Sequence, residues 1–295
     1  MQYNVYIDNI GRRYLMYKIT SKEQLNPTVV KMTVEAPLVA KKAEPGQFVI
    51  ICADRDSERI PLTIADYNRQ SGEISIIFQT VGASTTALSN KSEGGELFAV
   101  AGPLGTPTNV AGMKKVAVIG GGVGCAIAYP VAKKLSENGA EVHSIAGFRS
   151  KELVILEKEF EKISSKYFLM TDDGSAGEKG LVTNALESLI QQGENYDCVI
   201  AIGPLVMMKF VCLLTKKYNV KTIVSMNPIM VDGTGMCGGC RLTVGGETKF
   251  ACVDGPDFDG HLVDFDEAID RSRIYGDFER RERDKACRLF AKEAE

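Results

Sequence analysis

The stretch KVAVIGGGVGCAIA, residues 115–128, decides how the middle of this chain folds. An apolar run, a cluster of glycines and a run of small residues predict a buried strand, a turn and a helix. Such a turn lets the phosphates of a dinucleotide approach the backbone where the helix starts. The strict G-x-G-x-x-G spacing is absent, because its third glycine position is Cys125 counted from Gly120 and Ile127 counted from Gly122. The stretch therefore predicts a nucleotide site of a looser glycine-rich type.

Strand and helix patterns alternate from this stretch onward, and we assign residues 113–225 to one α/β domain. Strands are predicted at 141–148, 167–174, 197–202 and 221–226, with helices at 151–163, 180–192 and from 205 to about 218. This alternation is typical of a parallel, doubly wound sheet that binds its ligand at the carboxyl ends of its strands. The candidate nucleotide residues at those ends are Gly120, Gly121, Gly122, Val123, Gly124, Gly147, Arg149, Asp172, Asp173, Gly203 and Pro204.

Residues 16–112 show a different pattern, with short alternating strands and turn residues between them. Residues 29–34 and 74–79 are rich in β-formers, and glycine and proline interrupt the pattern at 44–47 and 102–105. No long helical period intervenes, so we predict a small antiparallel β-barrel. Residues 1–15 fit this pattern poorly and are treated as an extension of unknown role.

Two segments of the barrel carry groups suited to phosphate. Arg59 at the start of a strand can present its guanidinium to a phosphate, and the Thr63 hydroxyl can reach a ring nitrogen or a ribose. The alternative is a solvated arginine on an edge strand. Residues 82–88 place small hydroxyl residues where a helix begins, and free N–H groups at a helix start suit a pyrophosphate. A simple N-cap explains these hydroxyls equally well.

The most unusual chemistry lies near the end of the chain, in NPIMVDGTGMCGGC at residues 227–240. Cys237 and Cys240 form a C-x2-C pair, Cys252 follows after eleven intervening residues, and Asp232 lies five positions before Cys237. Thiolates at this spacing suit zinc or iron, and the glycines let the backbone curl around the sulfurs. A zinc site, an iron–sulfur cluster and a glycine-rich turn with incidental cysteines all remain open at this point. We assign this segment to residues 226–265.

The bulk composition narrows the class of protein. The chain has 295 residues, 44% hydrophobic and 25% charged, with a net charge of −3. This balance argues against disorder and against general attraction to nucleic acid or to an anionic membrane. We find no apolar run long enough to span a bilayer and no signal segment, so we expect a cytoplasmic protein. Cys52, Cys125, Cys198 and Cys212 lie in apolar stretches and are interpreted as core residues.

Two remaining features carry weaker signals. Residues 266–295 predict a helix rich in both signs of charge, which either lies in solvent or packs on a partner subunit. His143 and His261 belong to no Ser/His/Asp pattern or histidine cluster, which argues against a hydrolase and against a histidine-based metal site.

The order of barrel, nucleotide domain and thiolate segment resembles the ferredoxin–NADP reductase superfamily, and within it the electron-transfer subunits with a C-terminal [2Fe-2S] cluster. The resemblance extends over residues 16–267. Residues 59–63 resemble the flavin-binding segment, and residues 120–124 resemble the nicotinamide loop. Residues 202–208 resemble the family's C-G-P-x-x-M segment, with Ile202 where cysteine is usual, and this similarity adds Met207 to the nicotinamide site.

The segments 227–240 and 249–256 resemble the small subunits of NADH-dependent reduced ferredoxin:NADP oxidoreductases, a family also named sulfide dehydrogenase. The related dihydroorotate dehydrogenase electron-transfer subunits have four cysteines, the first at the position of Asp232. The resemblance implies that Asp232, Cys237, Cys240 and Cys252 hold a [2Fe-2S] cluster. It also implies an FAD site on the barrel, formed by Arg59, Pro61, Leu62, Thr63, Ala65, Gly82, Ser84, Thr85 and Thr86.

The resemblance further implies an oxidoreductase subunit in which hydride passes between NAD(H) and FAD, and electrons then pass to the cluster. We expect a heterodimer with a larger subunit that carries further FAD and [4Fe-4S] centres and reacts with NADP(H) and ferredoxin by flavin-based bifurcation. Arg149 leaves open a preference for NADP, although the family favours NAD(H). The alternatives are an electron-transfer subunit of dihydroorotate dehydrogenase or of sulfide dehydrogenase, and a zinc-stabilised nucleotide-binding module.

Overall fold

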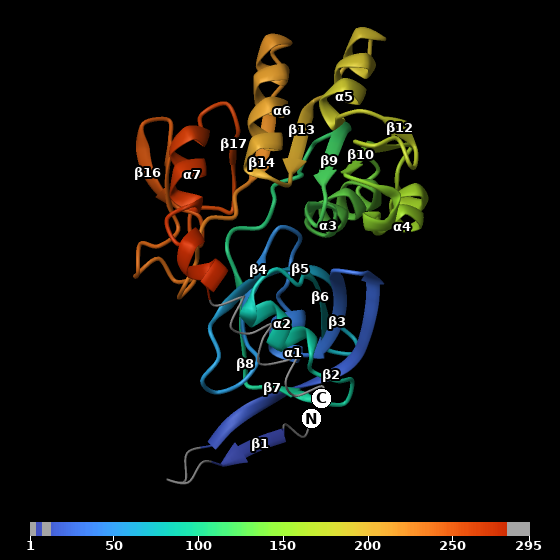
Figure 1. The fold of residues 1–295 in the computed structure, drawn as a ribbon. Coiled ribbons are helices and arrows are strands. Elements are labelled where there is room, and N and C mark those ends of the chain that lie inside the picture. The colour runs from blue at the N-terminus through green and yellow to red at the C-terminus, as the bar shows by residue number, and fades with distance from the viewer. Residues whose placement is uncertain (1–3, 8–12, 282–295) are drawn as a thin grey trace.

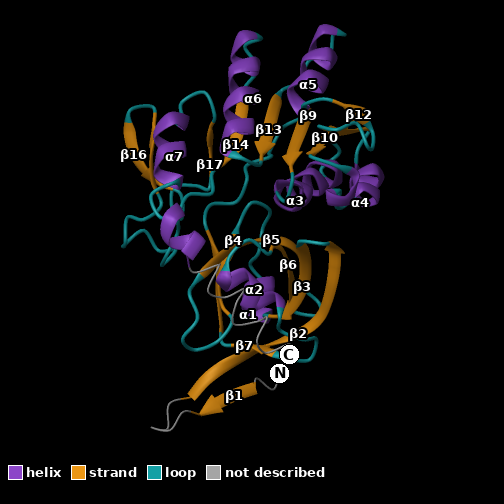
Figure 2. Cartoon of the chain, in the orientation of Figure 1, coloured by secondary structure: helices purple, strands orange, loops and turns teal. Residues whose placement is uncertain are grey.

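A computed structural model describes residues 4–7 and 13–281. Figure 1 shows a barrel of N-terminal strands and, beyond it, a second sheet flanked by helices, with the C-terminal segment beside that sheet. Figure 2 shows the same division by secondary structure, with few helices in the barrel and many around the second sheet. The predicted combination of an antiparallel barrel and a doubly wound α/β sheet is confirmed. Across the described ranges, no helix combines the length and apolar character that crossing a bilayer requires.

The barrel sheet has the strand order β1-β2-β3-β6-β5-β4-β8, with β7 paired to β2. All of its pairings are antiparallel. Isoleucines and valines on the inward faces of these strands form its core, with Phe78 and Leu88 fully buried. Its elements are β1 (Asn4–Ile7), β2 (Arg13–Asn26), β3 (Val29–Glu35), α1 (Pro37–Ala40), β4 (Phe48–Cys52), β5 (Ile60–Asn68), β6 (Glu73–Gln79), α2 (Ala83–Ser89), β7 (Glu96–Leu97) and β8 (Ala99–Leu104).

The first fifteen residues differ from the sequence expectation. Strand β1 pairs antiparallel with the start of β2, so that Asn4 lies opposite Met16 and Ile7 opposite Arg13. The barrel's second strand therefore begins before residue 16, and part of the predicted extension belongs to the sheet.

The second sheet has the order β12-β11-β10-β9-β13-β14-β17. Its first six strands are parallel, which confirms the predicted doubly wound arrangement. The helix predicted at 151–163 is split, because Leu156 adopts a left-handed conformation with φ 57° and separates a short 3-10 turn from α4. The elements are β9 (Lys115–Gly121), α3 (Gly124–Glu137), β10 (Glu141–Phe148), η1 (Lys151–Leu153), α4 (Glu157–Ile163), β11 (Lys166–Thr171), β12 (Glu178–Lys179), α5 (Val182–Gln191), β13 (Cys198–Ile202), α6 (Leu205–Lys217) and β14 (Thr222–Ser225).

The C-terminal segment returns to this sheet. Strands β15 (Arg241–Val244) and β16 (Glu247–Phe250) form a hairpin, and β17 (Asp257–Asp259) then pairs antiparallel with β14. The sheet is therefore mixed at this edge, where the sequence predicted only parallel strands. Helix α7 (Phe265–Ser272) follows, then a turn at 273–275 and helical residues 276–281. The remainder of the helix predicted at 266–295 lies outside the described residues.

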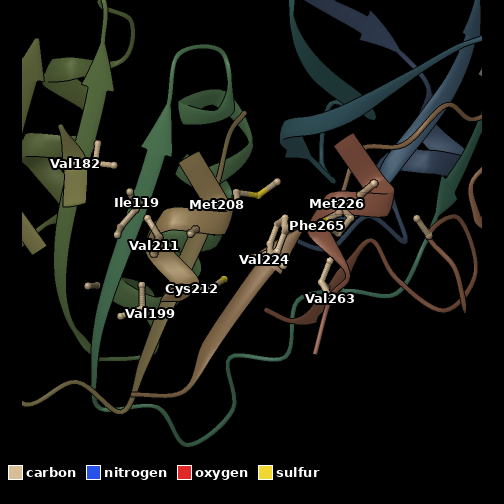
Figure 3. Close-up of a cluster of buried hydrophobic side chains, with 14 of the residues drawn as sticks. Ile119, Val182, Val199, Met208, Val211, Cys212, Val224, Met226, Val263 and Phe265 are labelled. Carbon is tan, nitrogen blue, oxygen red and sulfur yellow. The ribbon is translucent and has the colours of Figure 1, made fainter. Parts of the chain in front are cut away.

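One hydrophobic core joins all three parts of the chain. It contains Phe48 and Ile50 of the barrel, residues of the α/β sheet, and Cys240 and Leu242 of the C-terminal segment. Figure 3 shows part of this core, where α6, β14 and the C-terminal residues Val263 and Phe265 contribute side chains to one cluster. The three parts are therefore packed as one unit.

Three of the four thiols predicted to fill the core are buried, whereas Cys52, the last residue of β4, is only half-buried. Cys125, Cys198 and Cys212 are buried among apolar side chains. Burial raises the pKa of the Cys125 thiol to about 12, that of Cys198 to about 11 and that of Cys212 to about 12. They remain protonated at neutral pH and act as small hydrophobic residues.

Candidate nucleotide, flavin and cluster sites

A cavity of about 900 Å³ lies between the barrel and the carboxyl edge of the α/β sheet. It is large enough for a nucleotide, since ligand pockets of roughly 300–1,000 Å³ are usual. The sheet contributes most of the nucleotide residues predicted from sequence: Gly121, Gly122, Val123, Gly124, Gly147, Arg149, Asp172, Gly203, Pro204 and Met207.

The glycine turn after β9 is required by packing as well as by ligand access. A Cβ atom on Gly124 would lie 2.4 Å from the Ile202 carbonyl oxygen, and one on Gly120 would lie 2.6 Å from the Cys125 sulfur. Gly122 has a φ of +55° and donates its N–H to the Gly147 oxygen at 2.8 Å. Gly120 does not line the cavity. Its role in the turn is therefore to let α3 approach the strand.

Two neighbouring aspartates at the end of β11 have different environments. The Asp173 carboxylate accepts the N–H of Ser175 at 2.9 Å and its hydroxyl at 2.6 Å, and these bonds lower the pKa of Asp173. It is thus engaged within its own loop and does not line the cavity. Asp172 lines the cavity, as does Arg149, whose guanidinium makes no hydrogen bond or ion pair with the described residues. Asp172 and Arg149 are therefore placed to contact a nucleotide.

The barrel supplies residues that the sequence did not single out. Asn26, Thr28 and Gln79 line the cavity from the β2–β3 turn and the end of β6. The Asn26 side chain also donates to the Leu153 oxygen at 3.0 Å, which links the barrel to the α/β domain. The only sequence signal was the turn-forming Asn-Pro-Thr at 26–28, which does not show what the turn faces.

The predicted flavin residues lie outside the walls of this cavity, on β5 and at the start of α2. Leu62 packs on the barrel core and Ala65 on the core that contains α3, so neither offers its side chain to a ligand. Pro61 and Thr63 alternate with the inward residues and lie on the other face of the strand. Arg59 is exposed, and its guanidinium has no hydrogen bond or ion pair within the described ranges.

The start of α2 lies close to Arg59, because the Ser84 hydroxyl bonds to the Glu58 carboxylate. The Thr85 and Thr86 hydroxyls both donate to the Gly82 oxygen, at 3.1 and 2.9 Å. These hydroxyls serve the helix start, so the groups left for a phosphate are the first-turn N–H groups and the arginine. That donor set fits an FAD pyrophosphate.

Three of the four candidate cluster ligands, Asp232, Cys237 and Cys240, lie in the loop between β14 and β15, here called the cluster loop, and Cys252 follows the β15–β16 hairpin. The sulfurs of Cys240 and Cys252 are 3.2 Å apart and buried, whereas Cys237 is exposed. Backbone N–H groups are directed at the sulfurs, from Gly239 to Cys237 and from Cys252 to Cys240, each at 3.5 Å. Burial and the neighbouring Cys240 thiol raise the pKa of Cys252 to about 12, so a bound metal is needed to keep it a thiolate.

Asp232 completes this donor set. Its carboxylate accepts the N–H of Thr234 at 2.8 Å and that of Cys237 at 2.9 Å, and these bonds lower its pKa. An ionised carboxylate and three thiols that lose their protons on binding metal supply four anionic ligands, a set that suits a [2Fe-2S] cluster.

The spacing of these donors does not match a preformed zinc site. A tetrahedral zinc ion, with bonds of about 2.3 Å, brings all its sulfur ligands within about 4 Å of one another. Within the described ranges, the one group of three donors that all lie within 4.8 Å of one another is Glu141, His143 and Glu194. Among the cluster ligands, the Cys240 and Cys252 sulfurs form a close pair, but no third donor lies that close to both. The cluster loop therefore fits a centre with two metals better than a single ion.

The Glu141–His143–Glu194 group has a structural explanation. Lys115 pairs with both carboxylates, and the buried His143 ring lies between the Tyr196 hydroxyl at 2.8 Å and the Glu141 carboxylate at 2.9 Å. Burial lowers the pKa of His143. The lysine ammonium already supplies the cation, so this group stabilises the edge of the sheet where the parallel strands begin.

The cluster loop packs against the barrel. Gly233, with φ +74°, lies so close to β4 and β8 that a Cβ atom would be 2.8 Å from Leu104 Cδ1 and 3.1 Å from Ile50 Cγ1. Ile50 is paired with Pro61 of β5. Paired residues of antiparallel strands have Cα atoms roughly 5 Å apart. The cluster loop thus lies on the strand next to the predicted flavin segment.

Comparison with known proteins agrees with this arrangement. Residues 227–264 match the iron–sulfur cluster binding domain of dihydroorotate dehydrogenase B. The chain is 50% identical over 268 residues to an uncharacterized protein in the adh 3′ region of Clostridium beijerinckii, covering 88% of this chain and 90% of that protein. It is 45% identical over 263 residues to a dihydroorotate dehydrogenase B (NAD(+)) electron transfer subunit homolog of Thermotoga maritima, covering 89% and 93%.

The similarity extends to named electron-transfer subunits and to solved structures. The subunit of dihydroorotate dehydrogenase B from Geobacillus thermodenitrificans is 34% identical over 259 residues, covering 84% of this chain and 97% of that protein. A chain of the NADH-dependent reduced ferredoxin-NADP oxidoreductase, studied for flavin-based electron bifurcation, superposes with a TM-score of 0.86 at 42% identity, covering 93% and 97%. The ferredoxin reductase in carbazole 1,9a-dioxygenase shares the fold at a TM-score of 0.58 and 17% identity, covering 70% and 65%. The chain therefore belongs to the family of dihydroorotate dehydrogenase B electron-transfer subunits and their homologues, oxidoreductase subunits with a ferredoxin-reductase-like fold.

Proposed function

We propose that this chain passes electrons between NAD(H), an FAD on the barrel and a [2Fe-2S] cluster held by Asp232, Cys237, Cys240 and Cys252. We infer that it does so as the small subunit of a flavin-bifurcating NADH-dependent ferredoxin:NADP oxidoreductase. Its partner would be a larger subunit carrying further FAD and [4Fe-4S] centres. The 42% identity with the chain of that oxidoreductase over 93% of the present chain supports this choice.

The observation that supports the proposal is that the barrel with the predicted flavin segment contacts both the cluster loop and the nucleotide cavity. Gly233 packs on the strand that pairs with the predicted flavin strand. The same barrel faces the nucleotide cavity. This packing supports short separations between the proposed electron carriers. A nucleotide-binding module with only a structural zinc does not require its metal site to lie beside the barrel.

The chain's own residues have distinct roles in this proposal. Arg59 and the first-turn N–H groups of α2 bind the FAD pyrophosphate, and Thr63 with the backbone at Pro61 and Leu62 faces the flavin ring. The glycine turn after β9 binds the NAD(H) pyrophosphate, and the cavity walls exclude water from the nicotinamide. When bound, FAD accepts hydride from the nicotinamide and passes its electrons on singly.

We propose NAD(H) as the nucleotide. The Asp172 carboxylate in the cavity favours a ribose hydroxyl and repels a 2′-phosphate, while Arg149 can stack on the adenine. Stopped-flow reduction of the bound flavin by NADH and by NADPH tests this choice. Faster or tighter reduction by NADPH would contradict it.

Anaerobic purification followed by metal analysis, absorbance and electron paramagnetic resonance (EPR) tests the cluster. We expect two irons per chain, a flavin spectrum and a reducible [2Fe-2S] signal. Cys237→Ser should lose iron, whereas Cys52→Ser, which removes a thiol of β4 outside the cluster loop, should retain it. A colourless protein that contains only zinc would refute the redox function.

The second candidate is an electron-transfer subunit of dihydroorotate dehydrogenase, which the match at residues 227–264 favours. Asp232 at the position of the first cysteine counts against it. Co-purification separates the two candidates. A large iron–sulfur flavoprotein that reacts with NADP(H) and ferredoxin supports the first, and a dihydroorotate-oxidising partner supports the second.

A further inference from the structure

Asp257 is a buried carboxyl group at the point where the three parts of the chain meet. It lies on β17 opposite Ser225, the last residue of β14, and Ser225 lines the nucleotide cavity. Its Oδ2 accepts the Thr108 hydroxyl at 2.5 Å, and the Thr108 N–H bonds to Pro45 just before β4. The carboxyl group is therefore one side chain away from the cavity and close to the barrel strand that packs against the cluster loop.

Only one of the two carboxyl oxygens of Asp257 has a hydrogen-bond partner among the described residues. Oδ1 is buried and has no hydrogen-bond partner in the described ranges, whereas Oδ2 accepts the Thr108 hydroxyl. A buried ionised carboxylate with a bare oxygen is costly, because no donor replaces the lost water. A proton on Oδ1 removes the charge without breaking the Thr108 bond. The geometry thus leaves one position open for a proton.

Among the described residues, no cation compensates the charge of the Asp257 carboxylate. Burial is the largest cause of the raised pKa of Asp257, about 6, and the side chains of Thr108 and Ser225 oppose it. No charged side chain in the described part of the chain contributes to this shift. The titratable groups on the neighbouring segments bond elsewhere: Asp254 to Phe250, Asp259 to His261, His261 to Thr215 and Glu44 to Arg69.

We propose that Asp257 is a redox-linked proton acceptor, which binds one proton at Oδ1 when the neighbouring redox groups gain an electron and releases it when they lose that electron. This inference rests on the proposed function, in which NAD(H) supplies the electrons. An electron entering this interior adds negative charge where screening is weak, which raises the proton affinity of a nearby carboxylate. The carboxylate becomes a carboxylic acid, the proton comes from water, and the net charge of the interior is unchanged.

The test is an EPR-monitored redox titration of the cluster in the complete protein, carried out between pH 5 and pH 8. The midpoint potential should be level below pH 6, fall as the pH rises and level off again once Asp257 is ionised in both redox states. A tenfold difference in proton affinity between those states corresponds to a total fall of about 59 mV for one electron. Asp257→Asn should abolish the fall, whereas Asp259→Asn, the same change two residues along the strand, should retain it.

A second variant keeps the carboxylate. Thr108→Val removes a hydrogen bond that lowers the pKa of Asp257, so the fall in potential should move to higher pH without losing amplitude. Reduction should also produce a protonated-carboxyl band in the infrared difference spectrum of the wild type, absent from Asp257→Asn.

Two results would overturn the inference in different ways. A wild-type potential that is independent of pH, measured on an intact cluster signal, refutes the role of Asp257 alone. A protein with no reducible cluster refutes the proposed function and this inference with it.

Discussion

Replacing Gly233 by alanine tests how the cluster loop is held on the barrel. Its φ of +74° costs an alanine about 1 kcal/mol relative to glycine. The added methyl group would also lie 2.8 Å from Leu104 Cδ1 and 3.1 Å from Ile50 Cγ1. Both contacts are to side chains rather than to backbone, and the nearer one is to the end of Leu104, so we take the low end of the usual overpacking cost, about 1–2 kcal/mol. Gly233→Ala should therefore destabilise the protein by about 2–3 kcal/mol in total.

The matched control is Gly246→Ala in the same segment. Gly246 has a φ of +83°, and apart from its chain neighbours no atom of the described residues lies within 4 Å of the position that a Cβ would take. Gly246→Ala should lower the free energy of unfolding only by the backbone contribution of about 1 kcal/mol. Chemical unfolding of the two purified variants, followed by flavin fluorescence, measures the difference, which we expect to be about 1–2 kcal/mol.

Electron transfer gives a second comparison. Displacing the Gly233 loop from β4 should slow cluster reduction after mixing with NADH, whereas Gly246→Ala should leave that rate unchanged. Equal stabilities and equal rates for the two variants would show that contact between loop and barrel does not position the cluster.

Three further predictions concern the other sites. Gly124→Ala places a methyl group 2.4 Å from the Ile202 carbonyl oxygen, and the backbone cannot easily move to relieve this contact. The variant should bind NADH at least tenfold more weakly, as measured by calorimetry, and unchanged binding would contradict our account of the turn. Arg59→Ala should raise the dissociation constant of FAD at least tenfold, measured by fluorescence after flavin release, while leaving the iron content unchanged. Asp257 has a folded-state pKa of about 6 against an ordinary aspartate pKa of 3.8, so its contribution to stability is present below about pH 4 and is lost as the pH rises through 6. The oxidised wild type should lose about 3 kcal/mol relative to Asp257→Asn between pH 4 and pH 8 in urea unfolding, and parallel pH profiles would refute this.

Local patterns in the sequence predicted the elements that are themselves local. The strand, glycine turn and helix at 115–128 follow from consecutive residues, and the structure has β9 and α3 there. The C-x2-C pair with Asp232 and Cys252 was visible because its members share one short segment. Hydrophobic periodicity likewise predicted the barrel and the doubly wound sheet.

Features that depend on distant contacts were not predictable from the sequence. Asn26 and Gln79 complete the cavity from the barrel, and only the folded arrangement shows this. Asp172 and Asp173 look alike in the sequence, and the Ser175 bonds to Asp173 decide which one faces the ligand. Strand β17 was missed because its pairing partner, β14, ends some thirty residues earlier in the chain.

That pairing has a mechanical consequence. Because β17 completes the α/β sheet, the segment with the candidate cluster ligands and the domain with the candidate nucleotide site are joined in one unit that packs against the barrel. In the proposed electron path, any shift of this unit relative to the barrel changes two separations at once. One is between nicotinamide and flavin, and the other is between flavin and cluster. The two electron-transfer steps are therefore coupled. A movement that changes the separation between nicotinamide and flavin also changes the separation between flavin and cluster.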